Sequence, residues 1–499
     1  MKRTIALILI LSQLLLLAAC SETPVEESQE ETSGSVQNTA DTTESESVEE
    51  EPMPDLPARN FEGDNFVFIT RSYTGQHSAA DIMDIWAEGE TGEGLNDAVF
   101  QRNMWMADTY NVVIEEVKTS NAPNMITTSV AAMDGAYDIS YIKANDAQTL
   151  AKSGNFLNYK TLDYIDLKAP WWDNNAAEEL EIAGKLFLGV NDIMLANNNA
   201  TSAVVFNKQM LIDHGYTENM YDLVKENKWS LDKVSEMAER VLNDVDGNGI
   251  YDENDIYGYM CYRDAAMSMF HSSGGRIATK NTDGNLELTV GQEFFYDAFY
   301  ASLLLMTQKY TFNIHKEMEA KYSSTYYQIA EEMFRQDQAL FYWILVHDIQ
   351  KFRDMESDFG ILPVPSYDPE ISGYGSTVNQ YHGCMMSILT TADPDQAAYI
   401  LEVMAAKSRY TVQEEYYNIC LTRKYSRDED SAEMLDIIFD NRIYDVGAYY
   451  NIGEFTATIN SLTMKNITDV ASVIKRKDKS ARRQIEELVA DYSAIESIE

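Results

Sequence analysis

The stretch DVDGNGIYDEND, residues 244–255, has oxygen-bearing side chains at the spacing of a calcium-binding loop. Gly249 stands at the sixth loop position, where such loops turn sharply. Four carboxylates this close together repel one another unless a cation lies among them. The sequence therefore predicts a structural Ca²⁺ site, to which Ile250 offers its backbone carbonyl and Asp252 a water-mediated contact. The expected ligands are Asp244, Asp246, Asn248, Ile250, Asp252 and Asp255.

The loop departs from the common pattern at its end, where Asp255 stands in place of the usual glutamate. The residues that follow, IYGYMCYR, have the pattern of a strand and not of a second helix. We therefore expect a fixed link between a helix and a strand instead of a switching helix pair. The alternative is an Asn, Asp and Gly-rich turn that its own side-chain hydrogen bonds stabilise.

The amino-terminal residues have the pattern of an export signal. Lys2 and Arg3 precede an apolar run over 5–17, which is shorter than the ~20 residues that a membrane-spanning helix needs. The tetrad Leu17-Ala18-Ala19-Cys20 resembles the lipobox of bacterial lipoproteins. The resemblance implies that residues 1–20 form a signal peptide, that Cys20 is lipidated, and that the mature chain lies on the extracellular face of the cell membrane. Calcium outside cells is abundant enough to fill even a weak site.

Residues 21–60 are rich in Ser, Thr and Glu, with Arg59 as the single basic residue. A segment with so few apolar side chains cannot bury enough surface to offset the entropy lost on ordering. We expect a disordered acidic tether, which charge repulsion extends. An acidic tail that binds a basic partner is the alternative.

Composition excludes several partners and leaves the cysteines open. The formal net charge of -43 disfavours nucleic acid and anionic membrane surfaces, because both carry negative charge. Cys261, Cys384 and Cys420 are widely spaced and form no CxxC motif, so the sequence shows no zinc or redox site. We expect them to be buried as small apolar residues, with one disulfide as the alternative.

The part of the chain after residue 60 is too long for one hydrophobic core, so two lobes are expected. Strand-like and helical patterns alternate from NFVFITR to YDISYIKAND in βαβαβ order, which predicts a parallel sheet flanked by helices. Ligands of such sheets bind beyond the carboxyl ends of the strands. Arg71, Tyr73 and Lys143 would lie there. Farther along, the runs 185–190 and 202–207 read as strands, and a helix begins near Lys208.

A second helix follows Ser230, whose hydroxyl is suited to cap its first turn. Its apolar residues keep the 3.6-residue spacing of a helix with one buried face. The calcium-like loop follows this helix directly. The apolar positions are Leu231, Val234, Met237, Ala238, Val241 and Leu242.

Four segments together resemble extracellular solute-binding proteins of ABC importers, in the family that includes many sugar binders. Each segment is short, but their order and spacing cover nearly all of residues 61–420. They correspond to the first crossing between lobes, the tryptophan-started helix with its loop and strand, the return toward the first lobe, and the helix after it. The segments are SAVVFNKQML, NKWSLDKVSEMAERVLNDVDGNGIYDENDIYGY, AEEMFRQDQALFYWILVHDIQKFRDMESDFGILPVPSYDP and TADPDQAAYILEVMAA.

The resemblance implies an α/β, two-lobe periplasmic-binding-protein-like fold of type II. Each lobe would hold a mainly parallel sheet flanked by helices, and a central cleft would lie between them. Lobe 1 is expected over 61–200 and 360–408, and lobe 2 over 201–359 and 409–499, where the last helices form a cap. The partners implied are a small solute and the permease subunits of an ABC transporter, and the chain would act as a monomer.

The sequence contains 31 tyrosines and 6 tryptophans, and aromatic faces suit the apolar faces of sugar rings. Trp343 stands where the family places a strand end that faces the cleft. Trp171, Trp172 and Tyr450 are further aromatic candidates. For every aromatic residue the alternative is core packing, and for Arg71 and Lys143 it is a surface ion pair. The expected ligand-binding residues are Arg71, Tyr73, Lys143, Asn198, Tyr262, Trp343, Tyr381 and Tyr449.

These patterns favour capture and delivery of a solute, most plausibly an oligosaccharide, without covalent chemistry. No G-x-S-x-G, H-E-x-x-H or phosphate-loop motif occurs in the chain. The competing functions are a glycosidase, which needs two positioned carboxylates, and a surface adhesin that binds glycans without a transporter.

Overall fold

The computed structural model describes residues 52–72, 82–418 and 429–495. Cys20, Tyr73 and Cys420, with the expected signal peptide and most of the expected tether, lie outside the described residues. The described residues belong to one compact unit, Glu51–Glu499. Within them, no helix is both long and apolar enough to cross a membrane.

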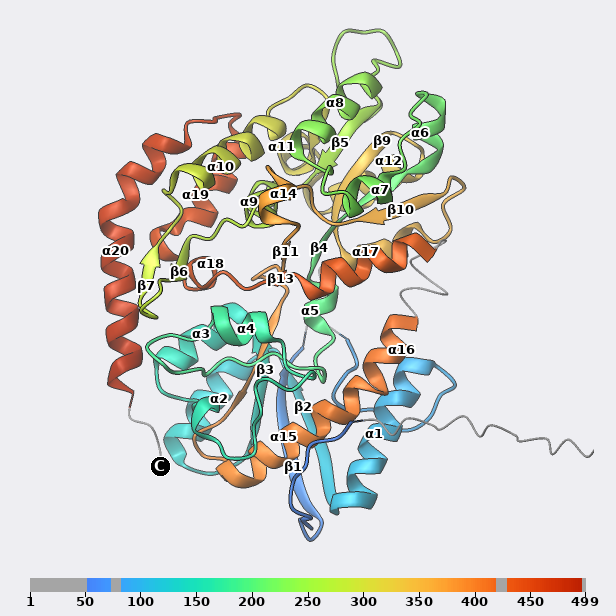
Figure 1. Cartoon of the computed structure of the whole chain (residues 1–499). Helices are drawn as coiled ribbons and strands as arrows, with labels where there is room; N and C mark the ends of the chain where they lie inside the picture. Colours follow the sequence, from blue (N-terminus) through green and yellow to red (C-terminus); the bar gives the residue numbers. More distant parts are fainter. Residues whose placement is uncertain (1–51, 73–81, 419–428, 496–499) are drawn as a thin grey trace, which may run out of the picture. The chain divides into compact units, whose positions relative to one another are not determined.

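The first sheet has the strand order β12-β3-β1-β2 (Figure 1). β1 is parallel to β2 and to β3, and β12 is antiparallel to β3. The βαβαβ order expected after residue 60 is therefore confirmed. The strands are β1 (Asp64–Arg71), β2 (Val112–Thr119), β3 (Ile139–Lys143) and β12 (Cys384–Ile388). The helices with this sheet are α1 (Gly94–Tyr110), α2 (Ala122–Ala132), α3 (Ala144–Lys152), α4 (Asn174–Glu179), α15 (Pro394–Arg409) and α16 (Val412–Asn418).

The second sheet has the order β10-β4-β9-β5-β8. β5 is parallel to both β8 and β9, so the carboxyl ends of these three strands meet at one edge. β4 is antiparallel to β9 and β10. Both sheets thus combine parallel and antiparallel pairs, and the α/β class with helix-flanked sheets is as expected. The strands are β4 (Ser202–Asn207), β5 (Tyr257–Cys261), β8 (Thr311–Asn313), β9 (Ala339–Leu345) and β10 (Phe359–Leu362).

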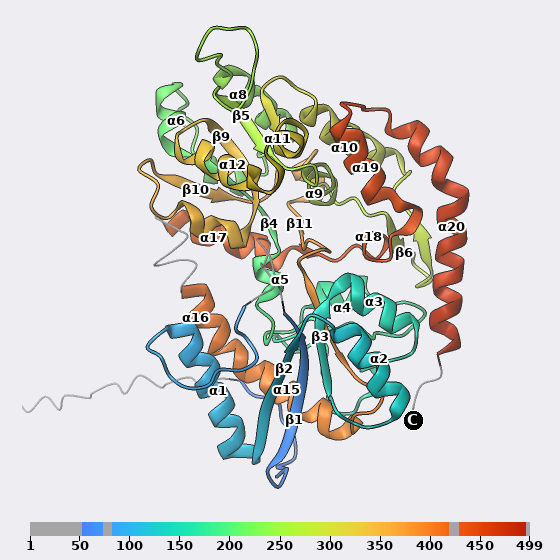
Figure 2. The same ribbon diagram turned by 180° about the vertical axis from the view of Figure 1, so that it is seen from behind.

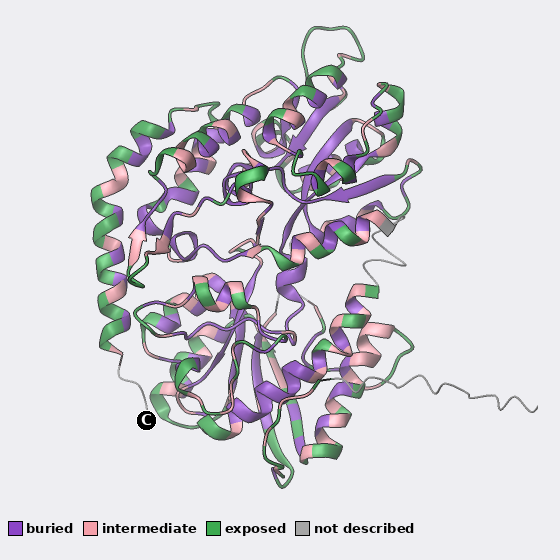
Figure 3. Cartoon of the chain, viewed as in Figure 1, coloured by how far each residue is buried: buried purple, intermediate pink, exposed green. Residues whose placement is uncertain are grey.

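The strands of the second sheet are buried, and the remaining helices of this part of the chain pack on the sheet or on one another (Figure 3). Their bounds are α6 (Lys208–Asp213), α7 (Met220–Lys225), α8 (Leu231–Val241), α9 (Ala265–Ser272), α10 (Glu293–Met306), α11 (Ile314–Tyr322), α12 (Tyr326–Arg335), α13 (Val346–Ile349), α14 (Pro369–Ser372), α17 (Glu429–Asp440), α18 (Val446–Tyr449) and α19 (Phe455–Met464). A two-stranded ribbon, β6 (Ala278–Lys280) and β7 (Leu286–Leu288), lies beside them.

Helix α8 illustrates how local sequence determines this packing. The Ser230 hydroxyl accepts a hydrogen bond from the backbone N–H of Lys233 over 3.1 Å, which confirms the expected cap. The apolar face of the helix is buried, as its spacing predicts. Gly258 in β5 permits a close approach, because a Cβ atom there would lie 2.2 Å from the Cα of Ala238. The glycine of the Tyr-Gly strand after the loop is therefore required for the close contact between β5 and α8.

Two boundaries differ from those expected. β10 pairs with β4 in the second sheet, so the chain returns to the first sheet after residue 362 and not at residue 360. Helix α16, expected in lobe 2, packs against α1 of the first sheet. The run 185–190, expected as a strand, makes only isolated bridges, such as that of Gly189 with Met386. The run therefore meets β12 at a single position and does not form a ladder with it.

Two crossings between the sheets lie entirely within the described residues. The short helix α5 (Ala196–Asn199) leads directly into β4, and β11 (Ser376–Thr377) precedes β12 on the return. β11 pairs in parallel with β13 (Arg442–Ile443), so a late segment of the chain braces the return crossing.

Helix α20 (Val470–Ala494) was expected to cap lobe 2, and it also contacts the other half of the unit. It packs against α10 and β7, and its far end packs against α3 (Figure 2). Asp491 pairs with Lys152 over 3.2 Å, and the ring of Tyr492 lies 5.2 Å from that of Phe187. The carboxyl-terminal residues therefore belong to both lobes.

The end of the expected tether is part of the folded unit. Met53 and Leu56 pack against the core, and the Tyr399 hydroxyl donates to the carbonyl oxygen of Pro57 over 2.9 Å. The guanidinium of Arg59 lies 4.6 Å from the centroid of the Tyr164 ring. Packing thus begins before residue 60, because these few apolar and aromatic contacts suffice to anchor the segment.

Candidate functional site

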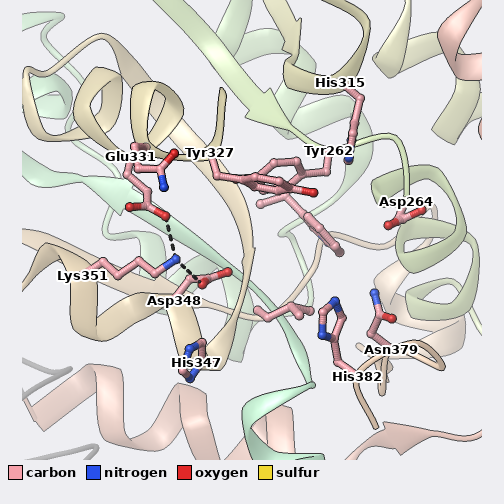
Figure 4. A pocket seen from close by; sticks show the side chains of 13 residues that line it. Tyr262, Asp264, His315, Tyr327, Glu331, His347, Asp348, Lys351, Asn379 and His382 are labelled. Carbon is pink, nitrogen blue, oxygen red and sulfur yellow. Dashed lines mark hydrogen bonds and ion pairs between the residues drawn. The ribbon is translucent and has the colours of Figure 1, made fainter. Parts of the chain in front are cut away.

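A cavity of about 300 Å³ lies beyond the carboxyl ends of β5, β8 and β9 (Figure 4). This is the edge at which parallel strands of an α/β sheet present ligand-binding residues. The lining consists of Tyr262, Asp264, His315, Tyr327, Gln328, Glu331, Trp343, Leu345, His347, Asp348, Lys351, Asn379 and His382.

Each lining group comes from the residues that follow a strand or from the helix beside it. Tyr262 and Asp264 follow β5, and His315 follows β8. Trp343 and Leu345 are in β9, and α12 and α13 supply most of the remaining groups of this half. Lys351 lies in the short 3-10 turn directly after α13. Asn379 and His382 come from the return crossing, so the cavity is bounded by the segment that links the two sheets.

Aromatic rings cluster around Tyr262. Its ring centroid lies 5.5 Å from that of Tyr327 and 6.2 Å from that of Trp343, the latter at an interplanar angle of 71°. The hydroxyl groups of Tyr262 and Tyr342 are hydrogen bonded over 2.7 Å. This hydrogen bond therefore fixes the position of the Tyr262 ring.

Trp343 is only 3% exposed, yet it lines the cavity. Its Nε1 atom has no hydrogen-bond partner among the described residues, although the atom itself is buried. Buried indole N–H groups normally find an acceptor. Trp343 therefore contributes its ring to the cavity wall, and its Nε1 atom would need a local movement to meet a ligand oxygen.

Ionisable groups form a second cluster in the cavity. The ammonium of Lys351 lies 2.6 Å from a Glu331 oxygen and 2.9 Å from an Asp348 oxygen. Burial lowers the pKa of Lys351, but the two carboxylates outweigh it and raise the pKa overall. Burial lowers the pKa of His347, so this imidazole is neutral at pH 7. Its Nδ1 atom lies 3.3 Å from the amide nitrogen of Gln350.

Asp264 stands apart from these ion pairs in Figure 4. Its Oδ1 accepts a hydrogen bond from Asn460 Nδ2 over 2.5 Å. Burial raises the pKa of Asp264, while the neighbouring Arg263 charge opposes that shift. The guanidinium of Arg263 lies 3.5 Å from Glu319 on α11.

Of the expected ligand-binding residues, Tyr262 and Trp343 lie together in this cavity. Tyr381 and Tyr449 line a smaller neighbouring cavity of about 40 Å³. Tyr381 is 43% exposed, whereas Tyr449 is buried and donates to the carbonyl oxygen of Val378 over 3.0 Å. The Tyr449 hydroxyl is therefore occupied by the return crossing.

The other expected residues lie away from the cavity. Arg71 pairs with Asp146 over 3.5 Å and lines a separate cavity of about 10 Å³ at the first sheet. Lys143 is not among the residues that line that cavity. Burial lowers the pKa of Lys143. Asn198 is buried, and its Nδ2 donates to Gln413 over 3.0 Å at another opening of about 610 Å³. The structure thus does not bring these three residues to Trp343.

Trp171 and Trp172 are core residues and not binding platforms. Their indole nitrogens donate to the two carboxylate oxygens of Glu402, over 2.9 and 2.8 Å. Both indoles and Glu402 are buried. Burial raises the pKa of Glu402 to about 7, although the two indole hydrogen bonds oppose it.

Sequence patterns missed most of the polar lining. His315 follows a strand of only three residues, and Asn379 and His382 lie in an irregular crossing. The one available signal was histidine content, because three of the six histidines in the chain line this cavity. These three are His315, His347 and His382.

The loop over 244–255 gathers three of its expected calcium ligands. Ligand oxygens of Asp244, Asp246 and Asp255 all lie within 4.8 Å of one another, whereas Asp252 is not part of the group. Asp244 accepts backbone hydrogen bonds from Gly247 and Gly249, each over 2.8 Å, which shape the loop. These residues fit a calcium ion, and they fit equally the alternative of a turn with internal hydrogen bonds.

The two described cysteines are buried free thiols, as expected for Cys261 and Cys384. Burial raises the pKa of the Cys384 thiol to about 12 and also raises that of Cys261. Neither thiol is therefore a reactive nucleophile at pH 7.

No protein-family model and no curated protein matches this chain. Solved structures do match. UspC of M. tuberculosis shares 15% identity at a TM-score of 0.54, with 84% of this chain and 100% of that chain covered. A sugar transporter from Rhizobium etli, in an open conformation, shares 16% identity at a TM-score of 0.52, with 86% and 100% covered.

A cyclo/maltodextrin-binding protein complexed with maltotetraose shares 12% identity at a TM-score of 0.54, with 85% of this chain and 96% of that chain covered. Identities this low establish the fold. The resemblance to sugar-binding solute-binding proteins seen in the sequence is thereby confirmed at the level of the fold.

Proposed function

We propose that this chain is a lipid-anchored extracellular substrate-binding protein that captures an oligosaccharide between two lobes and delivers it to an ABC transporter permease. The observation that carries the proposal is the cavity beyond β5, β8 and β9, in which aromatic rings meet polar side chains. Ligand pockets combine apolar walls with a few placed polar groups in this way.

The chemistry of the lining suits a sugar. The rings of Tyr262, Tyr327 and Trp343 offer flat apolar faces to the C–H faces of a pyranose. Imidazoles, carboxylates and the Asn379 amide offer hydrogen bonds to its hydroxyl groups. The names of two structural neighbours, a sugar transporter and a protein complexed with maltotetraose, support the same ligand class.

The position of the cavity supports a role in lobe closure. Asn379 and His382 belong to the return crossing, while the rest of the lining surrounds the second sheet. A ligand that contacts both the return crossing and the second sheet favours the conformation in which it makes the two sets of contacts at once. Hinge closure around a solute follows from this without any covalent step.

Isothermal calorimetry of the purified chain against a panel of oligosaccharides tests the proposal. We expect saturable heat with one class of oligosaccharide at one site per chain. Loss of that heat in Trp343→Phe, with the fold intact by circular dichroism, would place the ligand in this cavity. Absence of binding to every oligosaccharide on the panel would contradict the proposal.

The proposal also states that the protein releases the bound sugar without chemical change. Glu331 and Asp348, two of the cavity carboxylates, are both paired with Lys351. Prolonged incubation with the oligosaccharide that binds, followed by product analysis, separates this role from that of a glycosidase. Release of shorter sugars that requires Glu331 or Asp348 would contradict a binding role.

The membrane anchor and the calcium site are parts of the same proposal. For the anchor, we expect Cys20→Ser to release the chain from cells into the medium, and retention on the cells would contradict it.

For the calcium loop, we expect millimolar Ca²⁺ to raise the melting temperature of the wild type and not that of Asp246→Asn. Asp283→Asn, in another exposed turn, is the control. An equal response of all three proteins would favour the hydrogen-bonded turn.

A further inference from the structure

The charges that line the cavity are unbalanced. Three carboxylates, those of Asp264, Glu331 and Asp348, face a single ammonium, that of Lys351, and the described lining includes no guanidinium. Burial keeps the His347 imidazole neutral, so it adds no positive charge at pH 7. The lining residues therefore carry more carboxylates than cations, and the charge of Arg263 beside Asp264 offsets only part of this difference.

The only ammonium is already engaged on one side of the cavity. Lys351 lies 2.6 Å from Glu331 and 2.9 Å from Asp348. Two carboxylates therefore share one cation. An additional positive charge from a ligand would be attracted to this pair and not repelled by it.

Asp264 is the carboxylate with the greatest need of a cation. Its side chain accepts a hydrogen bond from the neutral amide of Asn460 over 2.5 Å, and the nearby Arg263 lies 3.5 Å from Glu319. Burial raises the pKa of Asp264, which shows that the site penalises the ionised form. A ligand cation beside it would remove this penalty.

Aromatic faces in the same cavity add to the preference for a cation. The Tyr262 and Tyr327 rings lie 5.5 Å apart, and His315 lies 5.3 Å from Tyr262 on the side of Asp264 (Figure 4). Tyrosine faces attract ammonium groups through the ring quadrupole. A sugar carboxylate or sulfate, by contrast, would meet three like charges, and the neighbouring Arg263 is already paired with Glu319.

We propose that the sugar unit bound in this cavity carries a free amine, protonated at pH 7, and that the amine lies against Asp264. The inference rests on the proposed sugar-binding function and narrows its ligand to amino sugars with an unacetylated nitrogen. The same geometry excludes acidic sugars such as uronates from the site.

A matched ligand series tests the inference. Calorimetry of the full chain compares oligomers of glucosamine with the same oligomers after N-acetylation and with uronate oligomers of equal length. A charge-assisted hydrogen bond contributes enough to predict about tenfold to hundredfold tighter binding of the free amine. We expect no measurable binding of the uronates. Equal or tighter binding of the N-acetylated form would overturn the inference and leave sugar binding intact, whereas no binding of any oligomer would overturn the proposed function itself.

Asp264→Asn tests the residue. The variant should lose the preference for the amine and retain any binding of the neutral oligomer, while Asp283→Asn, in a distant exposed turn, should keep the preference. Persistence of the preference in Asp264→Asn would overturn the role of Asp264.

If Asp264→Asn does not fold, a measurement on the wild type tests the same contact. An ammonium beside Asp264 should lower its raised pKa and release a proton. In a series of pH values across the range where carboxyl groups titrate, binding heats should therefore differ between buffers of different ionisation enthalpy for the amine oligomer and agree for the N-acetylated one. Identical heats for the amine oligomer in both buffers at every pH would contradict the contact.

Discussion

The carboxyl ends of the two sheets differ in what they leave open. At the first sheet, Arg71 pairs with Asp146 over 3.5 Å and Tyr141 donates to Asp84 over 2.7 Å, and a cavity of only about 10 Å³ remains. At the second sheet, the same topological position opens a cavity of about 300 Å³ lined by rings and charges. Topology therefore identifies two candidate edges, and the side chains decide which of them can hold a ligand.

Loss of the indole at Trp343 should produce the largest effect at the second edge. Trp343→Ala removes a buried ring, so we expect a loss of about 3–5 kcal/mol in the free energy of unfolding. We expect binding of the oligosaccharide to weaken by at least about thirtyfold, as for an aromatic residue at the centre of an interface. Chemical denaturation and calorimetry measure the two effects separately. An unchanged affinity would show that the ligand binds elsewhere.

Glu402 separates tryptophans that stabilise the core from the one that lines the cavity. Its pKa is raised to about 7 in the folded chain, so folding favours the protonated form. Stability from this group is therefore complete below the ordinary glutamate pKa of about 4.5 and is lost as the pH rises through about 7. In Glu402→Gln, stability should fall less between these pH values, with no change in ligand affinity. Parallel pH profiles of the two proteins in thermal melts would contradict the burial of an ionisable group there.

Arg71 should show the smallest effect. Its partner Asp146 is exposed enough for solvent to screen the pair, and such pairs contribute at most about 1 kcal/mol. Arg71→Ala should therefore change both stability and ligand affinity little, in contrast to the equivalent changes at the second edge. A tenfold loss of affinity in this variant would show that the carboxyl end of the first sheet takes part in binding, as the sequence pattern predicts.

Local patterns predicted the elements well where one segment determines its own structure. The spacing of apolar residues in α8 and the cap at Ser230 need only the helix itself, and the strand 202–207 was predicted with its observed bounds. The run 185–190 has the same local appearance, but its fate depends on a distant partner, Met386. Pairing between distant segments is not encoded in the pattern of either one.

The binding cavity was predictable only where an aromatic residue stood at a strand end. Trp343 and Tyr262 met that condition. His315 lies at the start of α11 after a three-residue strand, and His347 lies in the short helix α13. Asn379 and His382 lie in an irregular crossing, and none of these segments has a strong period. Trp171 and Trp172 were further candidates behind Trp343, and a single buried acceptor, Glu402, assigns them to the core.

Native mass spectrometry of the full chain with a mixture of oligosaccharides tests the central claim most directly. The account predicts one bound sugar per chain, of unaltered mass, and its disappearance in Trp343→Phe but not in Arg71→Ala. A chain that binds no oligosaccharide, or that converts the mixture into shorter sugars, would contradict it.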